Sequence, residues 1–271
     1  MGPGEGPPNQ AVRKTSMFKK AAVLVVSCGA VLAGCGTDVQ SENEEIISNL
    51  VKAGYPRSEL IISEDKVYAG YDAHVTLEAS YEMLDSQGSN EQYRTSNLVG
   101  TGVSKICIVP TSQFNSYSRL SAGLDLAIAN YNGLNLRLNF VRGSFADCDA
   151  TISARTTSGT GGSAGFPSGG KPYGTINIGV GLQNYSDDVS EHVITHELGH
   201  CIGFRHSDYY DRSISCGGGY SNEGQSSVGA IHIPGTPTDA RVGGSIMNSC
   251  FRATESGEWS SSDKTALDYL Y

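Results

Sequence analysis

The sequence predicts an α+β fold in which a twisted mixed β-sheet packs against helices. The first observation is the order strand, helix, strand, strand across residues 103–155, which fits a sheet covered by helices. The second is the strict apolar alternation of residues 134–141, which is typical of a half-buried strand. The third is a further strand at 175–180 that leads into a long helix at 189–202, with a last helix at 263–271.

The elements of this region each have a local signal. A mostly apolar run predicts a strand at 103–109, and Pro110 ends it. Helical spacing of leucine, alanine and isoleucine predicts a helix at 118–130. A short strand is expected at 151–155. Residues 158–174 are rich in glycine and serine, so they are expected to form a flexible loop.

The stretch before this region has weaker signals. Residues 37–45 are acidic and polar and are expected to be a tether, and residues 85–98 are expected to be a linker. Short elements are expected between them in this order: a helix at 44–52, strands at 60–62 and 66–68, and a strand followed by a helix within 72–84.

Five residues form a pattern typical of a metal site. His196 and His200 are four residues apart, which on a helix puts both imidazoles on one face within reach of one ion. Glu197 then points to the side of that ion, where it can hold and deprotonate a water instead of binding the metal. Gly203 can end the helix in a left-handed conformation. His206 can therefore return as a third ligand.

Three histidine ligands leave one position of a tetrahedral zinc ion open to water, which is the catalytic rather than the structural arrangement. The alternative is a helix with two exposed or core histidines, and it is less consistent with a pattern that specifies five positions. His192 lies one turn before His196, and we assign it to the surface or to helix capping because His206 completes the set. We expect one catalytic Zn²⁺ ion.

This pattern resembles the zinc-binding run of the metzincin peptidases, in which H-E-x-x-H-x-x-G-x-x-H is followed by a Met-turn. Residues 245–249, Ser-Ile-Met-Asn-Ser, resemble that turn. Met247 is then expected beneath the zinc site, and the alternative is a methionine that only fills the core. The resemblance implies a metzincin-like zincin domain with a twisted mixed sheet, an active-site helix, a Met-turn and a C-terminal helix.

Within that clan the chain is similar to the bacterial dual-action HEIGH metallopeptidases. The matching stretches are the run 196–208, the Ile-Pro-Gly-Thr-Pro segment at 233–237, and the final segment 260–271 ending Tyr-Leu-Tyr. Leu198 stands where the family's name has isoleucine, a small change in side-chain shape. The likeness covers residues 105–271.

The resemblance implies a zinc-dependent endopeptidase that hydrolyses peptide bonds of extended protein substrates by attack of a zinc-bound water, with Glu197 as the catalytic base. The strand at 175–180 is expected to be an antiparallel edge strand that pairs with the substrate main chain. One alternative is a non-catalytic, zinc-stabilised surface binding module, which the intact Glu197 argues against. The other is a hydrolase of non-peptide amides, which only substrate profiling distinguishes.

Two supporting roles remain open in the sequence. Asp208 resembles an acidic residue of the family, and it either orients His206 through the second ring nitrogen or is a plain turn residue. Some metzincins have a tyrosine two residues after the methionine of the Met-turn, but this chain has Ser249 there. Help for the oxyanion is therefore absent or comes from another group. The candidates are Tyr209, Tyr210 and Arg205.

The N-terminus resembles an export signal. A basic pair precedes an apolar run at 21–34, which is too short to span a membrane as a helix. The run ends Leu-Ala-Gly before Cys35 and resembles a bacterial lipobox, which implies cleavage and lipid attachment to Cys35. The alternative is ordinary signal cleavage with an incidental cysteine. Met17 is the expected true start, so residues 1–16 are not expected to belong to the fold.

These signals place the protein outside the bacterial cytoplasm. Gly36 follows the lipid-bearing cysteine instead of an aspartate that favours inner-membrane retention. We therefore expect a lipid anchor in the outer membrane or cell surface, with release after processing as a further option. The formal net charge of −9 argues against a nucleic-acid partner. We expect a monomer that acts on peptide or protein substrates.

Three regions follow along the chain. Residues 1–34 are the N-terminal extension and signal peptide, 35–98 the tether and propeptide, and 99–271 the catalytic domain. The stretch ending at Asp72 loosely resembles prosegments that place an aspartate carboxylate on the zinc and keep the enzyme latent. The alternative is a surface aspartate in a strand turn.

Five cysteines remain after the signal region, an odd number that allows at most two disulfides. We expect Cys107–Cys148, because both lie in or beside strands of one sheet, and Cys216–Cys250. Cys201 points off the ligand face of its helix and is expected to be buried or disulfide-bonded.

Overall fold

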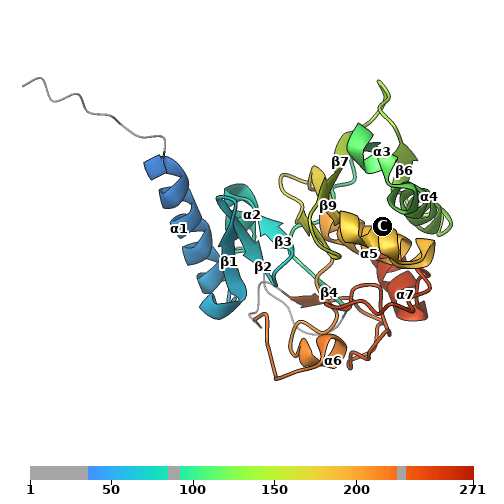
Figure 1. Cartoon of the computed structure of the whole chain (residues 1–271). Coiled ribbons are helices and arrows are strands. Elements are labelled where there is room, and N and C mark those ends of the chain that lie inside the picture. Colours follow the sequence, from blue (N-terminus) through green and yellow to red (C-terminus); the bar gives the residue numbers. More distant parts are fainter. Residues whose placement is uncertain (1–35, 85–91, 225–229) are drawn as a thin grey trace, which may run out of the picture. The chain divides into compact units, whose positions relative to one another are not determined.

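The protein is described here from a computed structural model over residues 36–84, 92–224 and 230–271 (Figure 1). Cys35, the expected lipid site, and the signal region lie outside the described residues. The elements in chain order are α1 Gly36–Lys52, η1 Arg57–Glu59, β1 Leu60–Ser63, β2 Lys66–Ala69, β3 Ala73–Val75, α2 Leu77–Glu82, β4 Tyr93–Arg94, β5 Lys105–Pro110, α3 Ser112–Ser116, α4 Ser118–Asn132, β6 Asn139–Arg142, β7 Ala150–Thr157, β8 Gly162–Gly165, β9 Thr175–Gly179, η2 Val180–Asn184, α5 Asp187–Ile202, α6 Ser213–Cys216, β10 Ile231–His232 and α7 Ser261–Leu270.

The described strands form a mixed eight-stranded sheet in the order β1-β2-β3-β8-β9-β7-β5-β6, and β4 pairs separately with β10. The β1-β2-β3 part is an antiparallel meander. Strand β3 then pairs in parallel with β8, which is antiparallel to β9. The remaining pairs, β9 with β7, β7 with β5 and β5 with β6, are parallel. The α+β class and the mixed sheet are confirmed.

The prediction of an edge strand at 175–180 is wrong. Strand β9 occupies that position in the sequence, but it lies between β7 and β8. The strand beyond it, β8, comes from the stretch that was expected to be a flexible loop. Glycine and serine weaken local strand signals, so only the pairing with β9 and β3 reveals β8.

Two other local predictions differ from the structure. The strand expected at 134–141 begins only at Asn139, and Asn135 has a positive φ of 54°. Leu134 and Leu136 still pack against the core, so their alternation reflects burial in an irregular segment. The polar tether expected at 37–45 is helical and belongs to α1. The first half of α1 consists mainly of acidic and polar residues, a composition that is also typical of an unstructured tether.

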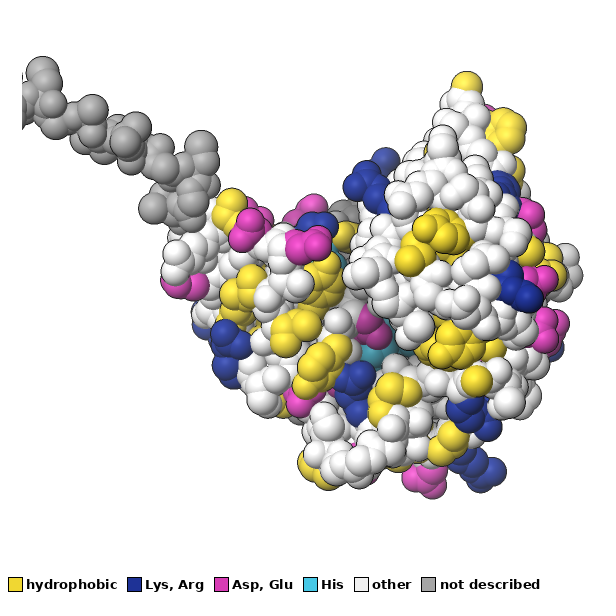
Figure 2. Space-filling view, viewed as in Figure 1, with side chains coloured by type: hydrophobic (Ala, Val, Ile, Leu, Met, Phe, Trp, Pro, Cys, Tyr) yellow, Lys and Arg dark blue, Asp and Glu magenta, His cyan; other side chains and the backbone are white. Residues whose placement is uncertain are grey.

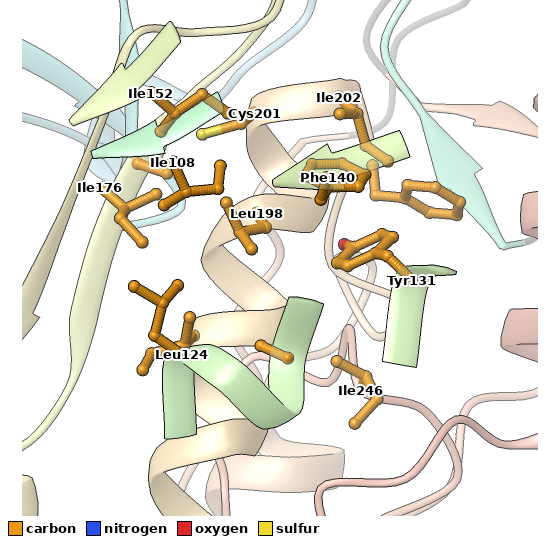
Figure 3. Packing of buried hydrophobic residues seen from close by; sticks show 14 of the residues in the cluster. Ile108, Leu124, Tyr131, Phe140, Ile152, Ile176, Leu198, Cys201, Ile202 and Ile246 are labelled. Atoms are coloured by element: carbon orange, nitrogen blue, oxygen red, sulfur yellow. The ribbon is translucent and has the colours of Figure 1, made fainter. Parts of the chain in front are cut away.

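Two hydrophobic clusters lie on different parts of this sheet. The larger one joins α4, α5, α7 and the strands β5 to β9, and includes Leu124, Ile152 and Leu198 (Figure 3). The smaller one joins α1, α2 and β1 to β3, with Phe166 as its member from beyond that region. The N-terminal part therefore has a core of its own while sharing the sheet.

Helix α5 is the central element of the larger cluster, because every residue from Val189 to Ile202 is buried. The Ser186 side chain caps its start by accepting from the backbone N–H of Val189. Its end is the left-handed Gly203, at φ 114°, where a Cβ would lie 2.5 Å from the carbonyl oxygen of Asn97. The role predicted for this glycine as the end of the helix agrees with the geometry.

Two disulfide bonds link cysteines of the described residues. The structure contains the disulfides Cys107–Cys148 and Cys216–Cys250, and Cys201 is a buried free thiol. Both expected pairings are therefore confirmed. Among the described residues, no helix is long and apolar enough to cross a membrane.

Candidate metal centre

Three histidines converge at the C-terminal end of α5. His196 and His200 lie one turn apart on that helix, and His206 returns after the turn at Gly203. Their ring centroids are 4.7, 4.9 and 5.2 Å apart, and all three side chains are buried. The predicted ligand set is therefore brought together in one place.

Each ring has its Nδ1 atom in a hydrogen bond that points its Nε2 inward. His196 Nδ1 lies 2.8 Å from the carbonyl oxygen of Ile246. His200 Nδ1 lies 2.8 Å from that of Phe204. His206 Nδ1 lies 2.5 Å from Glu223 Oε1. Because a carbonyl or carboxylate oxygen accepts the Nδ1 proton, Nε2 is the atom of each ring left to bind a metal.

The Asp72 carboxylate faces the three Nε2 atoms. Its Oδ2 lies 3.1 Å from Nε2 of His206 and 3.9 Å from that of His196, and its Oδ1 lies 3.8 Å from that of His200. The four donor atoms lie within 4.8 Å of one another. Gly70 and Tyr71 both have positive φ, at 63° and 78°. These two left-handed residues turn the chain so that Asp72 enters the site.

This donor set fits a zinc ion. The buried Nε2 atom of His200 and Oδ1 of Asp72 have no hydrogen-bond partner among the described residues. Buried polar atoms without partners are costly, so such a cluster is expected where an ion satisfies them. Imidazole nitrogens with one carboxylate oxygen form a donor set that zinc accepts.

Charge within the cluster agrees with a cation site. Burial lowers the pKa of His196 to about 4 and places that of His200 well below its ordinary value, so both rings are neutral ligands. Burial also acts to lower the pKa of His206, but Asp72 and Glu223 outweigh it and raise that pKa to about 10. Burial would raise the pKa of Asp72, yet His206, followed by the other two histidines, holds it below its usual range. The negative charges of Asp72 and Glu223 beside His206 are therefore the groups here that stabilise a positive charge.

Glu197 lies beside the cluster with a buried carboxyl group, 2% exposed. Its Oε2 has no hydrogen-bond partner among the described residues. Burial, followed by the charge of Asp72, raises its pKa well above the ordinary value. A cavity of about 260 Å³ opens next to it, lined in part by Asp72, His196 and Phe251. Acidic and histidine surfaces are visible in a hollow on the face shown in Figure 2. The predicted base therefore has room for a reacting group beside it.

Met247 lies against α5 between the two helical ligands. A Cβ on Gly199 would lie 2.6 Å from its sulfur. The turn that carries Met247 is held by Asp263, which accepts from Ser245 Oγ and from the N–H of Ile246. The Met-turn predicted from the sequence thus lies beneath the histidines and also supplies the carbonyl oxygen that orients His196.

Asp208 does not have the orienting position that was considered for it. Its carboxylate accepts from the backbone N–H and hydroxyl of Ser249 and of Ser215. It thereby joins the end of the Met-turn to helix α6. The position beside His206 Nδ1 belongs to Glu223, which is 15 residues further along the chain and outside the spacing that suggested Asp208.

Glu223 is the functional residue that sequence reasoning missed. It is 2% exposed, and two arginines neutralise it: Arg205 Nη2 at 3.3 Å and Arg212 Nε at 3.2 Å. It lies in a long irregular loop with no motif around it. The one signal available was an acidic residue inside a loop that connects the third histidine to the Met-turn.

The residues considered for the oxyanion are engaged elsewhere. Arg205 is buried against the rings of Tyr55 and Tyr209 and contacts Glu223. The Tyr210 hydroxyl accepts from the N–H of Ala240. The cavity beside Glu197 is lined by Asn248, Ser249 and His192. His192 was expected at the surface or in helix capping but is buried within α5, because that helix is covered on all sides.

Comparison with known proteins gives a family match and several similar solved structures. The family described as dual-action HEIGH metallo-peptidase matches residues 67–271. No curated protein matches the chain. Similar solved structures include high choriolytic enzyme 1, a hatching enzyme zinc-protease from Oryzias latipes (Medaka fish), with 19% identity, a TM-score of 0.40, and coverage of 65% of this chain and 92% of that chain. Two structures of myroilysin have 17% and 16% identity, TM-scores of 0.41 and 0.39, and cover 66% and 70% of this chain and 98% and 92% of those chains.

Replacing Glu223 by glutamine tests its role on His206. The amide cannot hold the Nδ1 proton as a carboxylate does, so we expect zinc affinity to fall by about 10- to 100-fold, the usual effect of losing such a partner. Chelator competition measures the zinc dissociation constant without substrate. Glu258→Gln makes the same change at an exposed site and should leave it unchanged. Equal affinities of the two variants would contradict the role.

Proposed function

Since the chain belongs to the dual-action HEIGH metallo-peptidase family, we propose that it is a zinc-dependent endopeptidase with His196, His200 and His206 as its zinc ligands and Glu197 as its catalytic base. The observation that carries the proposal is the convergence of three inward Nε2 atoms beside a buried carboxyl group that faces a cavity. We propose one zinc ion, because the described donor atoms surround one point.

The residues of this chain divide the chemistry between them. When bound, zinc supplies Lewis acidity to a water and to the carbonyl that is attacked. Glu197 accepts a proton from the attacking water and donates it to the departing amine. Ile246, Phe204 and Glu223 keep the imidazole rings fixed throughout.

Extended peptides suit the surroundings of this site. Strand β8 passes beside Glu197, and a Cβ on Gly162 would overlap the Glu197 carboxylate. The main chain of β8 is therefore the part of the sheet nearest to the base. An extended substrate that pairs with β8 would bring its own main chain to the same place. This strand takes the role that the sequence had suggested for 175–180.

Glu197 argues against the first of the two alternative functions. A zinc-stabilised binding module would need no carboxyl group that is buried and without a hydrogen-bond partner for one oxygen. Family membership also does not favour that alternative. A hydrolase of non-peptide amides would use the same groups, and profiling with peptide and non-peptide amides distinguishes it.

We further propose that the full chain is latent and that Asp72 is the inhibitory group. The Asp72 carboxylate occupies the space in front of all three Nε2 atoms, where a water or substrate carbonyl would have to lie. Asp72 directly precedes strand β3, which pairs with β8 through Ala73 and His74. The same segment therefore covers both the metal position and the main-chain position proposed for the substrate.

Further contacts keep this segment in place. Gly70 packs on Glu223, where a Cβ would lie 2.7 Å from Oε2. The Arg212 guanidinium lies 4.6 Å from the centroid of the Tyr71 ring. A carboxylate held in this way acts at an effective concentration of roughly millimolar or more, which a substrate must exceed.

Glu197→Ala tests the proposed chemistry. We expect kcat/KM for quenched peptides to fall by about 10²- to 10⁴-fold, the usual contribution of a general base, while bound zinc stays stoichiometric. Removing zinc with a chelator should abolish the remaining cleavage. The comparison is made with and without Asp72→Ala, so that latency does not hide activity. Full activity of Glu197→Ala would refute the scheme.

Asp72→Ala tests latency. Removing the carboxylate frees the metal position, so we expect the uncut full chain to gain peptide cleavage by about tenfold or more, given the effective concentration above. Glu78→Ala removes an exposed carboxylate from the same region and should change nothing. If both variants have the low activity of the parent chain while zinc is bound, Asp72 is not the inhibitory group.

We also propose that the mature chain is lipid-anchored through Cys35 on the outer membrane or cell surface of a bacterium. The lipobox-like run before Cys35 supports this. Incorporation of labelled palmitate in a bacterial host should be lost in Cys35→Ser and kept in Cys28→Ser. Equal labelling of both variants would exclude Cys35 as the attachment site.

A further inference from the structure

Residues 92–97 lie in the segment that sequence patterns assign to a linker before the catalytic domain. In the structure they are not a linker: the side chains of Gln92, Tyr93, Thr95 and Asn97 are buried, and Thr95 is 0% exposed. The Tyr93 ring packs on that of Tyr209 at 4.1 Å between centroids. This segment, called the brace from here on, is therefore part of a packed interior.

The brace hydrogen-bonds to the backbone that joins two of the metal ligands. The N–H of Thr95 donates to the carbonyl oxygen of Gly203 at 2.8 Å, and the N–H of Arg205 donates to that of Tyr93 at 2.7 Å. Arg94 forms an antiparallel bridge with Phe204. The brace thus runs as a strand along residues 203–205, the stretch between His200 and His206.

On its other side the brace pairs with β10. Tyr93 lies opposite His232 and Arg94 lies opposite Ile231, and the N–H of Ile233 donates to the carbonyl oxygen of Gln92 at 2.7 Å. The brace is therefore a central strand between β10 and residues 203–205. A strand paired on both sides holds its neighbours more firmly than an edge strand does.

The brace reaches all three histidines through these contacts. Phe204 supplies the carbonyl oxygen that orients His200, and residues 203–205 lead directly into His206. The amide of Gln92 donates to Asp263 Oδ1 at 3.2 Å. Asp263 holds the N–H of Ile246, whose carbonyl oxygen orients His196.

We propose that the brace is a positioning element of the metal site, and that it stays with the catalytic unit when the N-terminal segment is displaced. The second half of this proposal rests on the latency proposed above. The N-terminal segment has its own hydrophobic cluster, whose last buried member along this segment is Met83. The boundary between the inhibitory segment and the catalytic unit then lies before Gln92 instead of at residue 98.

The test uses Thr95→Pro and Thr95→Val in the full chain. Proline removes both the N–H and the hydroxyl that bond Gly203, whereas valine keeps the N–H and the side-chain volume and loses only the hydroxyl, which also donates to the carbonyl oxygen of Asn97. We expect the zinc dissociation constant, measured by chelator competition, to rise by about tenfold in Thr95→Pro and by a smaller factor in Thr95→Val. Equal affinity in a folded Thr95→Pro chain would overturn the positioning role.

A second pair of variants applies where proline prevents folding. Gln92→Ala removes the amide that bonds Asp263 and changes no backbone bond, and Gln113→Ala makes the same change at an exposed site of α3. Weaker zinc binding only in Gln92→Ala supports the proposal, and equal binding in both overturns it. No substrate is needed, so these results do not depend on whether the chain is a peptidase.

The boundary is tested by the mass of the active species. The full chain is treated with elastase, which can cut after small residues on both sides of Gln92, such as Ala79 and Val99; elastase is then inactivated with a serine-protease inhibitor, and intact-mass spectrometry identifies the N-terminus of the fraction that cleaves peptides. We expect it at or before Gln92, with or without the cut segment still bound. An active species that begins after Thr95 would overturn the proposal. If no activity appears in any fraction, while zinc is bound and Asp72→Ala is equally inactive, it is the proposed peptidase function that fails.

Discussion

The structure depends on the hydrogen bonds that fix the Nδ1 atoms of three histidines. Ile246, Phe204 and Glu223 accept those bonds from three separate parts of the chain. Only when all three are in place do the Nε2 atoms face one point. The Met-turn, the helix end at Gly203 and the long loop that carries Glu223 are each positioned to meet this requirement. Much of the polar network around α5 can therefore be read as support for ring orientation.

The sequence predicted the parts of this site that local chemistry determines. His196, His200, Gly203 and His206 follow from helix geometry and one left-handed turn, and Met247 follows from its family's motif. Glu223, β8 and the brace could not be found in this way. Their roles come from contacts between residues distant in sequence, and their segments are rich in small or polar residues that give no periodic pattern. Two strands there, β4 and β10, have only two residues each, too short for alternation to be seen.

The N-terminal part shares a β-sheet with the catalytic part, so sequence patterns alone do not locate the boundary between them. Its strands extend the same sheet as the catalytic strands, and Phe166, directly after β8 in the chain, belongs to its hydrophobic cluster. A segment that shares a sheet in this way cannot be displaced without loss of the β3–β8 pairing and the packing around Phe166. Latency of this kind would be stable, because it combines a carboxylate at the metal position with main-chain pairing and a separate apolar core.

Gly162 is important for both the proposed catalysis and the proposed inhibition. Because it has no side chain, the Glu197 carboxylate approaches the main chain of β8 directly. Any larger residue would push the base away from the strand on which a substrate is proposed to lie. Strand β3 pairs with β8, and Asp72, directly before β3, lies at the metal position. The position proposed for a substrate main chain is thus also the position of the proposed inhibitory segment. The two differ in the group that reaches the three Nε2 atoms, which is a peptide carbonyl in a substrate and a carboxylate in the segment.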